Sequence, residues 1–315
     1  MDLLTLYATA GFMLAAYSVV GNDSAQILGT FIASNHAIKW YYLWLGASIV
    51  LTFTLVYGWY INGGDISYGR LNKIPYMEIE WYHAAAPGVL VILTQFGIPV
   101  STTFLVLSTF ASTVVLEKML MKSIVGYGLA AIVAYGLWFT ISNFDKDKNG
   151  SIKESRKFWW RVLQWMSTGF LWFTWLSHDM ANIAVFLPRQ LPLPMLMGVI
   201  SILSAGLAYI FWNQGGKIQE IVLEKHNTRY VRSATIIDLV YGFILMFFKE
   251  LNDIPMSTTW VFVGLLAGRE LAIATVYKKK RFKAVFPLIT RDFFKMMIGL
   301  GVSVAIVVLI HNVFA

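Results

Sequence analysis

The sequence predicts an all-α polytopic membrane protein made of two inverted-topology repeats, with broken helices and re-entrant hairpins. Three observations support this prediction: a strongly apolar composition, long apolar segments, and two polar motifs that each occur twice. Hydrophobic residues make up 57% of the 315 residues, charged residues make up 13%, and the mean hydropathy is +0.63. Because soluble domains carry about 25% charged residues, this composition indicates a protein that lies in a membrane.

The two motifs recur at the same spacing. The segment Gly-Ile-Pro-Val-Ser-Thr-Thr at residues 97–103 returns as Asp-Ile-Pro-Met-Ser-Thr-Thr at residues 253–259. The segment Asn-Asp-Ser-Ala-Gln at residues 22–26 returns as His-Asp-Met-Ala-Asn at residues 178–182, and both pairs are 156 residues apart. Two matches at one spacing indicate an internal duplication, so we expect a site built from both copies between them.

The first expected repeat covers residues 1–156. We predict a broken helix, a span, a short helix, a longer helix and a final span over residues 3–34, 40–61, 83–96, 100–116 and 123–141. The first helix is expected to break at the polar residues 21–24. The short helix has too few residues to cross a hydrocarbon core of ~30 Å comfortably, whereas the span before it is long enough.

The second expected repeat covers residues 157–315 and follows the same plan. We predict its elements over residues 158–186, 192–212, 233–249, 255–276 and 293–314, with a basic loop before the last. In the first repeat, a Gly/Pro break after a short helix is typical of a re-entrant hairpin whose tip is buried in protein or lines a cavity, and the second repeat follows the same plan with Asp-Ile-Pro at residues 253–255. A hairpin returns to the side where it started, so each repeat crosses the membrane three times and the second is inverted.

The distribution of Lys and Arg predicts the orientation. With the N-terminus outside, the loops that fall inside hold 18 of the 25 basic residues, and the loops that fall outside hold 5. We therefore expect both termini outside, in the plasma membrane of a bacterium or archaeon. The basic run at residues 278–281 fits this pattern and a contact with anionic lipids, so we expect no nucleic-acid partner.

The Ser-Thr-Thr of each motif follows a proline that begins a helix. Hydroxyls, free backbone N–H groups and the positive end of the helix dipole suit an anion at such a position. A single motif of this kind is usually a helix cap. Because it occurs twice on expected hairpins, we predict a substrate site formed by Ser101, Thr102, Thr103, Ser257, Thr258 and Thr259.

The other motif places carboxylates and amides at the two broken helices. An Asp within an apolar span costs at least ~2.5 kcal/mol and therefore needs a partner. Carboxylate and amide oxygens suit a hard monovalent cation, although such residues also serve as a polar clamp between helices. We predict a coupling-cation site formed by Asn22, Asp23, Gln26, His178, Asp179 and Asn182.

A cation beside an anion offsets part of the desolvation cost of both, which is the physical basis of symport. The two aspartates favour phosphate over sulfate, because phosphate keeps a proton at neutral pH and can donate a hydrogen bond to a carboxylate. A permease for sulfate or another small anion, and a membrane anion sensor without transport, are the alternatives. No nucleophile–base pair is evident, so we expect no enzyme. The chain has no cysteine, which excludes disulfides and thiolate metal sites.

At these residues the chain resembles the inorganic phosphate transporter family. That family repeats a Gly-Ala-Asn-Asp-Val-Ala-Asn motif and a Pro-Val-Ser-Thr-Thr-His motif in two inverted halves, and the likeness extends to residues 216–218 and 232–245. The resemblance implies a secondary transporter that imports phosphate with Na⁺ or H⁺ by alternating access, with its hairpins in a moving domain. It implies no cofactor besides the coupling ion and leaves the oligomeric state open, a homodimer included.

The chain departs from the family pattern at several positions. The His after each Ser-Thr-Thr is replaced by Phe104 and Trp260, and a family Asn is replaced by Gln26 and by His178. An acidic residue expected within residues 40–61 is absent. His178 is either a hydrogen-bonding substitute or a titratable group that couples transport to protons. These departures bear on the ion and the anion more than on the fold.

Overall fold

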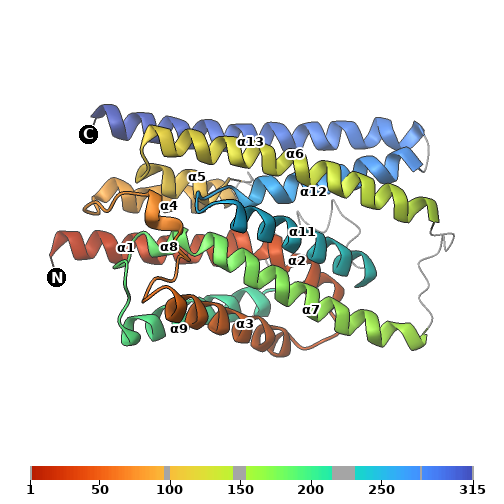
Figure 1. Ribbon diagram of the computed structural model, residues 1–315, viewed down its shortest axis with the longest axis horizontal. Coiled ribbons are helices and arrows are strands. Elements are labelled where there is room, and N and C mark those ends of the chain that lie inside the picture. Colours follow the sequence, from red (N-terminus) through yellow and green to blue (C-terminus); the bar gives the residue numbers. More distant parts are fainter. Residues whose placement is uncertain (1, 96–99, 145–153, 215–230, 277–278, 314–315) are drawn as a thin grey trace.

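The computed structural model describes residues 2–95, 100–144, 154–214, 231–276 and 279–313, and all regular structure within them is helical. Seven of the described helices are long and apolar enough to cross a membrane. The all-α polytopic architecture predicted from the sequence is therefore confirmed. The long helices run along one common direction, and α1 begins at the end of the molecule where α13 ends (Figure 1).

The described helices follow one another in this order. The first half contains α1 (Leu3–Ser18), η1 (Val19–Asp23), α2 (Ser24–Ser34), α3 (Trp40–Ile61), η2 (Arg70–Lys73), α4 (Trp81–Gln95), α5 (Thr102–Val106), η3 (Leu107–Thr109) and α6 (Thr113–Phe144). The second half contains α7 (Glu154–Asp179), α8 (Ala181–Ala184), α9 (Leu193–Trp212), α11 (Val231–Leu251), α12 (Thr258–Val276) and α13 (Lys279–Val313). The predicted repeat boundary adjoins residues 145–153, outside the described ranges, and the division into two repeats stays a prediction.

The first helix is continuous where the sequence predicts a break. The π-helical turn η1 joins α1 to α2, so the polar residues 21–24 stay helical. The Ser24 hydroxyl donates to the Val20 carbonyl within this turn. Such π-turns are frequent at functional sites, and this one carries Asp23. In the second half the predicted break is present, because α7 ends at Asp179 and a turn precedes the short α8.

Residues 100–116 do not form the single helix that the sequence predicts. α5 gives way to the 3-10 turn η3, and α6 begins only at Thr113. The Ser108 hydroxyl donates to the Phe104 carbonyl, and the Thr109 hydroxyl donates to the Val106 carbonyl. Local bonds of this kind compete with helical ones, which explains the early end of the helix.

Five other helices also test the predicted bounds. α3 and α9 match the spans predicted over residues 40–61 and 192–212. α11, with 21 residues, is longer than the predicted 233–249, whereas α12, with 19 residues, begins later than the predicted 255–276; each is long enough to cross a membrane. The predicted basic loop was wrong for residues 279–291, which lie within the 35-residue α13. Lys and Arg are good helix formers, so their charge does not end a helix.

Close helix packing joins the two halves. α6 packs along α12 with α13 beside them, while α3 packs on α9 at the other side of the molecule (Figure 1). Gly264 and Gly268 of α12 face the carbonyls of Tyr127 and Ala131 of α6, and a Cβ at either glycine would collide with that backbone. This Gly-x-x-x-Gly spacing allows the two helix backbones to approach closely.

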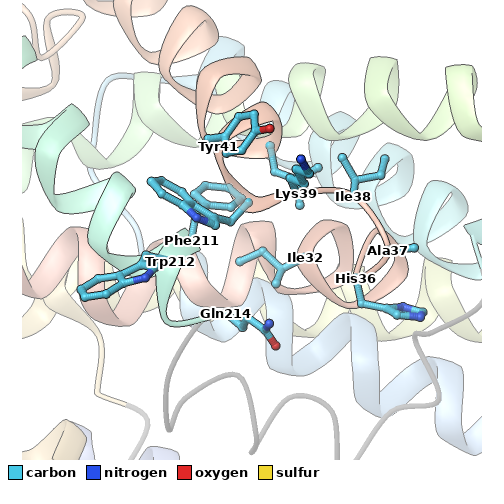
Figure 2. A pocket seen from close by; sticks show the side chains of 11 residues that line it. Ile32, His36, Ala37, Ile38, Lys39, Tyr41, Phe211, Trp212 and Gln214 are labelled. Atoms are coloured by element: carbon cyan, nitrogen blue, oxygen red, sulfur yellow. The ribbon is translucent and has the colours of Figure 1, made fainter.

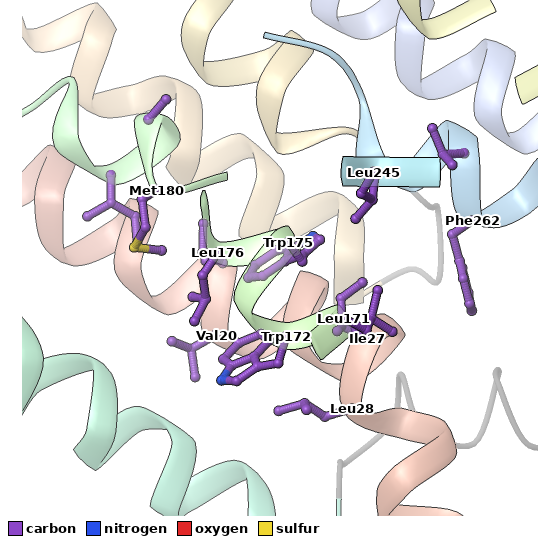
Figure 3. Packing of buried hydrophobic residues seen from close by; sticks show 14 of the residues in the cluster. Val20, Ile27, Leu28, Leu171, Trp172, Trp175, Leu176, Met180, Leu245 and Phe262 are labelled. Atoms are coloured by element: carbon purple, nitrogen blue, oxygen red, sulfur yellow. The ribbon is translucent and has the colours of Figure 1, made fainter. Parts of the chain in front are cut away.

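A buried cluster next to the repeated motifs also joins the halves (Figure 3). Trp172 and Trp175 of α7 are stacked with ring centroids 5.0 Å apart. Their indole N–H groups donate to the Ala47 carbonyl at 3.1 Å and to the Thr258 hydroxyl at 3.2 Å. Because buried indole N–H groups need such partners, these bonds fix α7 against α3 and α12. Around the two rings lie Val20, Ile27, Leu28, Leu171, Leu176, Met180 and Leu245 (Figure 3).

Candidate functional site

Asp179, at the end of α7, is the carboxylate on which both hairpins converge. It is 1% exposed. Its Oδ2 accepts a hydrogen bond from the Thr258 hydroxyl at 2.5 Å, and its Oδ1 accepts one from the Thr103 hydroxyl at 3.3 Å. Thr103 belongs to the first Ser-Thr-Thr and Thr258 to the second, so one carboxylate brings the two motifs together.

Asp23 occupies the corresponding position in the first half. It is 3% exposed and accepts a hydrogen bond from the Thr102 hydroxyl at 2.6 Å. The bond from Thr102 to Asp23 and the bond from Thr258 to Asp179 therefore recur at the 156-residue spacing of the sequence motifs. The adjacent Thr102 and Thr103 of α5 thus reach one carboxylate from each half.

The serines of the two motifs cap their helices in the same way. The Ser101 hydroxyl accepts from the Phe104 backbone N–H at 3.3 Å, and the Ser257 hydroxyl accepts from the Trp260 backbone N–H at 3.3 Å. The Phe104 and Trp260 rings, which stand where the resembled family has His, meet edge to face with centroids 5.5 Å apart. The two helix starts are therefore in contact.

The hydroxyl groups of the predicted substrate site are enclosed. All six hydroxyl-bearing residues are buried, none more than 5% exposed: Ser101, Thr102, Thr103, Ser257, Thr258 and Thr259. The structure therefore buries every residue that the sequence predicts for the anion, and it joins Thr103 and Thr258 at the Asp179 carboxylate. Hydroxyls and free N–H groups at two facing helix starts provide hydrogen-bond donors for an oxyanion.

His178 and Asn182 flank Asp179 and differ in their contacts. The His178 Nε2 donates to the Leu245 carbonyl at 2.7 Å, which directs the imidazole towards α11. The Asn182 Nδ2 donates to Asp179 Oδ1 at 3.3 Å and lies 3.4 Å from the Thr103 hydroxyl. Among the described residues, the His178 Nδ1 and the Asn182 Oδ1 are buried without a hydrogen-bond partner. An unmade buried bond costs about 1–3 kcal/mol, so both atoms are suited to a ligand.

The first cation motif is described only in part. The backbone of Asn22 lies in η1 and that of Gln26 in α2, whereas both side chains lie outside the described part of the structure, as do Gly97, Ile98 and Pro99. Within the described residues, no group of three His, Asp or Glu side chains is arranged to hold a metal ion. A cation at Asp179 would therefore take amide, hydroxyl or backbone oxygens as its other ligands.

Asp238 of α11 is a buried carboxylate that the sequence reasoning does not select. Its two oxygens accept hydrogen bonds from the Thr30 hydroxyl of α2 at 2.7 Å and the Thr168 hydroxyl of α7 at 2.5 Å. The sequence does contain a feature that could have identified it, because Asp238 is the one acidic residue in the apolar segment 233–249. An ionisable group inside a membrane span is a functional candidate by default.

Arg70 and Lys122 are buried cations beside the second motif, and the sequence reasoning does not select them either. The Arg70 guanidinium, 2% exposed, comes from η2 and lies 3.5 Å from the His178 Nε2. Burial lowers the pKa of Arg70 to about 10, although the nearby Asp179, Asp253 and Glu250 carboxylates act in the opposite direction. Arg70 therefore stays protonated at neutral pH.

A separate cavity of about 370 Å³ lies between the turn after α2 and the end of α9 (Figure 2). His36, Lys39 and Gln214 line it together with aromatic side chains such as Tyr41 and Trp212 (Figure 2). None of its lining residues belongs to the repeated motifs. The cavity is thus distinct from the enclosed hydroxyl site.

The apolar helices and the buried polar centre define an integral membrane protein with a transporter fold. A search of solved structures finds "the sodium-dependent phosphate transporter", which is 18% identical, with a TM-score of 0.61 over 100% of both chains. This likeness confirms the fold implied by the family resemblance. No protein-family model matches the chain, and no curated protein matches it.

Proposed function

We propose that the protein is a secondary active transporter that imports inorganic phosphate together with Na⁺ or H⁺ by alternating access. The observation that carries the proposal is the pair of threonine–aspartate hydrogen bonds at one sequence spacing, which join two helix starts in a buried centre. A solved structure with the same fold is named as a sodium-dependent phosphate transporter.

The buried hydroxyls of the two Ser-Thr-Thr segments supply the phosphate ligands in this proposal. Hydroxyls and helix N-termini bind an oxyanion without adding charge of their own. The Asp23 and Asp179 carboxylates can accept a hydrogen bond from the O–H group that phosphate keeps at neutral pH and that sulfate lacks. Binding would replace the present hydroxyl donors at the carboxylates with the protonated oxygen of the substrate.

The coupling cation would bind beside Asp179. The unpartnered Asn182 Oδ1 and the Asp179 carboxylate are hard oxygen ligands of the kind that Na⁺ takes. Asn22, Asp23, Gln26 and His178 complete the proposed set. Because the His178 Nε2 donates to Leu245, its Nδ1 is the atom left for a cation or a proton.

Transport requires the centre to open to each side in turn. The six hydroxyl-bearing residues are buried in the present form, so a movement of the helices around the two hairpin tips must expose them. In proteins of this design, alternating access arises from rigid-body rocking or gating of one bundle against the other. Transport, and not catalysis, is the chemistry that this arrangement serves.

Uptake by reconstituted protein tests the proposal. Proteoliposomes would receive radiolabelled phosphate or sulfate under an imposed Na⁺ or H⁺ gradient. We expect accumulation of phosphate that depends on one of the gradients. Accumulation of sulfate in place of phosphate would favour an anion permease of different selectivity, and ligand binding without flux would favour a sensor.

A further inference from the structure

Apart from the proposed coupling cation, the proposed phosphate site contains negative charge and hydrogen-bond donors but no positive charge. Asp23 and Asp179 each carry a carboxylate, and the serine and threonine hydroxyls around them are neutral. An anion with one or two charges is repelled by two carboxylates unless cations lie nearby. The buried Arg269 does not serve this purpose, because its guanidinium is paired with Glu270 at 2.5 Å.

Arg70 and Lys122 are the buried cations next to the second motif, and both are bonded to the same short segment. The Lys122 ammonium donates to the Ile254 carbonyl at 2.8 Å, and to the Asn252 side-chain and backbone oxygens at 2.8 and 3.1 Å. The Arg70 Nη1 lies 3.3 Å from the Ile254 carbonyl and 3.5 Å from the Asn252 carbonyl. Two positive side chains therefore share the oxygens of two residues.

These partners satisfy hydrogen bonds but carry no charge, and the carboxylates that act on Arg70 do so from beyond ion-pair distance. In the described part of the chain, no carboxylate oxygen lies within ion-pair distance of Arg70 or Lys122. Two buried like charges that share neutral acceptors repel each other, and burial makes each of them costly. An anion placed between them would relieve both costs.

The pair contacts a segment that leads from the surface to the enclosed hydroxyls. Asn252, at the start of the segment, is exposed, while Ser257 a few residues later is fully buried. Lys122 precedes Ser123, whose hydroxyl accepts from the Ser257 backbone N–H at 2.8 Å. Arg70 contacts His178, the neighbour of Asp179, at 3.5 Å. Lys122 is therefore adjacent in sequence to a residue that contacts the second Ser-Thr-Thr. Arg70 is in contact with the residue that precedes Asp179.

We propose that Arg70 and Lys122 form an anion-recognition pair that captures the transported oxyanion before it reaches the Ser-Thr-Thr hydroxyls. The proposal rests on the proposed function, and it assigns to these two residues the positive charge that the hydroxyl site lacks. The Arg70 guanidinium and the Lys122 ammonium bind the phosphate oxygens by charge-assisted hydrogen bonds. The carbonyls of Asn252 and Ile254 are the acceptors that the anion would replace.

The test compares charge-removing variants with matched controls in phosphate uptake. Arg70→Gln and Lys122→Gln are each expected to raise the KM for phosphate at least about tenfold, with a smaller change in maximal rate, because a charge-assisted bond to the anion is lost. Arg70→Lys and Lys122→Arg keep the charge and should recover most of the affinity. The stabilisation of the purified protein by inorganic phosphate, measured as a melting-temperature shift, should weaken in parallel.

Two control variants remove a basic side chain that does not contact the Asn252–Ile254 segment. Arg189→Gln removes an arginine that also donates to backbone carbonyls, those of Leu71, Ile74 and Pro75. Lys118→Gln removes an exposed lysine one turn before Lys122 on α6. Both controls should keep the wild-type KM for phosphate.

The possible failures are distinguishable. A wild-type KM in Arg70→Gln and Lys122→Gln, with only a lower melting temperature, would make the pair a structural clamp and overturn the inference alone. If the glutamine variants do not fold, a KM raised at least about tenfold in both charge-keeping variants would overturn it, because affinity would then not follow the charge. Wild-type protein that shows neither phosphate uptake nor stabilisation by phosphate would overturn the proposed function as well.

Discussion

At the scale of residues, the site is built from a hydrogen bond that occurs twice. Thr102 donates to Asp23, and Thr258 donates to Asp179, in each case from the second residue of a Ser-Thr-Thr. Thr103 adds a bond from the first hairpin to the second carboxylate. Because hydrogen bonds to charged groups contribute about 1.5–3 kcal/mol each, these bonds hold the two helix starts against each other.

Removing either carboxylate charge tests this arrangement. Asp23→Asn and Asp179→Asn keep the side-chain size but lose the charge that would bind the cation and the protonated phosphate. We expect each to lower phosphate uptake by about 10- to 100-fold, the equivalent of one charged hydrogen bond. Glu117→Gln, at an exposed position of α6, is the matched control. A folded Asp179→Asn protein with wild-type uptake would show that the carboxylate has no part in transport.

Sequence reasoning found the residues that repeat and missed those that do not. Ser101 to Thr103 and Asp23 were recognisable because their copies stand at one spacing, and the structure brings them together. Asp238 has no such copy, since Tyr82 stands 156 residues before it. In the sequence, Arg70 and Lys122 look like the ordinary charged residues of a loop and of a helix end. Their burial arises from tertiary packing, which no local pattern encodes.

At the scale of elements, polar side chains determine where an α-helix gives way to a π-turn or a 3-10 turn. The hydroxyls of Ser24, Ser108 and Thr109 take backbone carbonyls as acceptors, at the π-turn η1 and at the 3-10 turn η3. Apolar periodicity locates long spans such as α3 and α9 but does not detect these turns. The predicted break in the first helix failed for this reason, because the polar residues are accommodated in a wider turn.

The contact between α6 and α12 gives a prediction at this scale. Gly268→Ala places a Cβ against the Ala131 carbonyl of α6, where only hydrogen fits. We expect the free energy of unfolding to fall by at least about 1–3 kcal/mol, the usual cost of overpacking. The melting temperature of the detergent-purified protein measures this change.

Gly128→Ala on α6 is the control for that substitution. A Cβ at Gly128 meets no atom within 4 Å, and an alanine is a better helix former than glycine. Its melting temperature should therefore equal or exceed that of the wild type. Equal melting temperatures for Gly268→Ala and Gly128→Ala would contradict a close approach of the two helices.

At the scale of the whole molecule, the long helices bring both hairpins to a common centre. α1 and α13 have their free ends at one end of the molecule (Figure 1). The positive-inside distribution predicts that this end faces outward. The fold class was readable from composition and repeats, whereas orientation in the membrane rests on charge distribution alone and stays a prediction.

The absence of cysteine permits a direct test of orientation. Single cysteines would replace Tyr76, in the exposed loop before α4, and Asn213, at the exposed end of α9. A membrane-impermeant maleimide should label Tyr76→Cys in intact cells and Asn213→Cys only after permeabilisation. The reverse pattern would invert the predicted topology and place both termini inside.

An experimental density map of the protein with phosphate and Na⁺ tests the central claim most directly. We predict density for the anion within hydrogen-bond distance of hydroxyls from both motifs, Ser101 to Thr103 and Ser257 to Thr259, next to the Asp23 and Asp179 carboxylates. Density that touches only one hairpin, or that lies away from both, would contradict a shared site between the two halves.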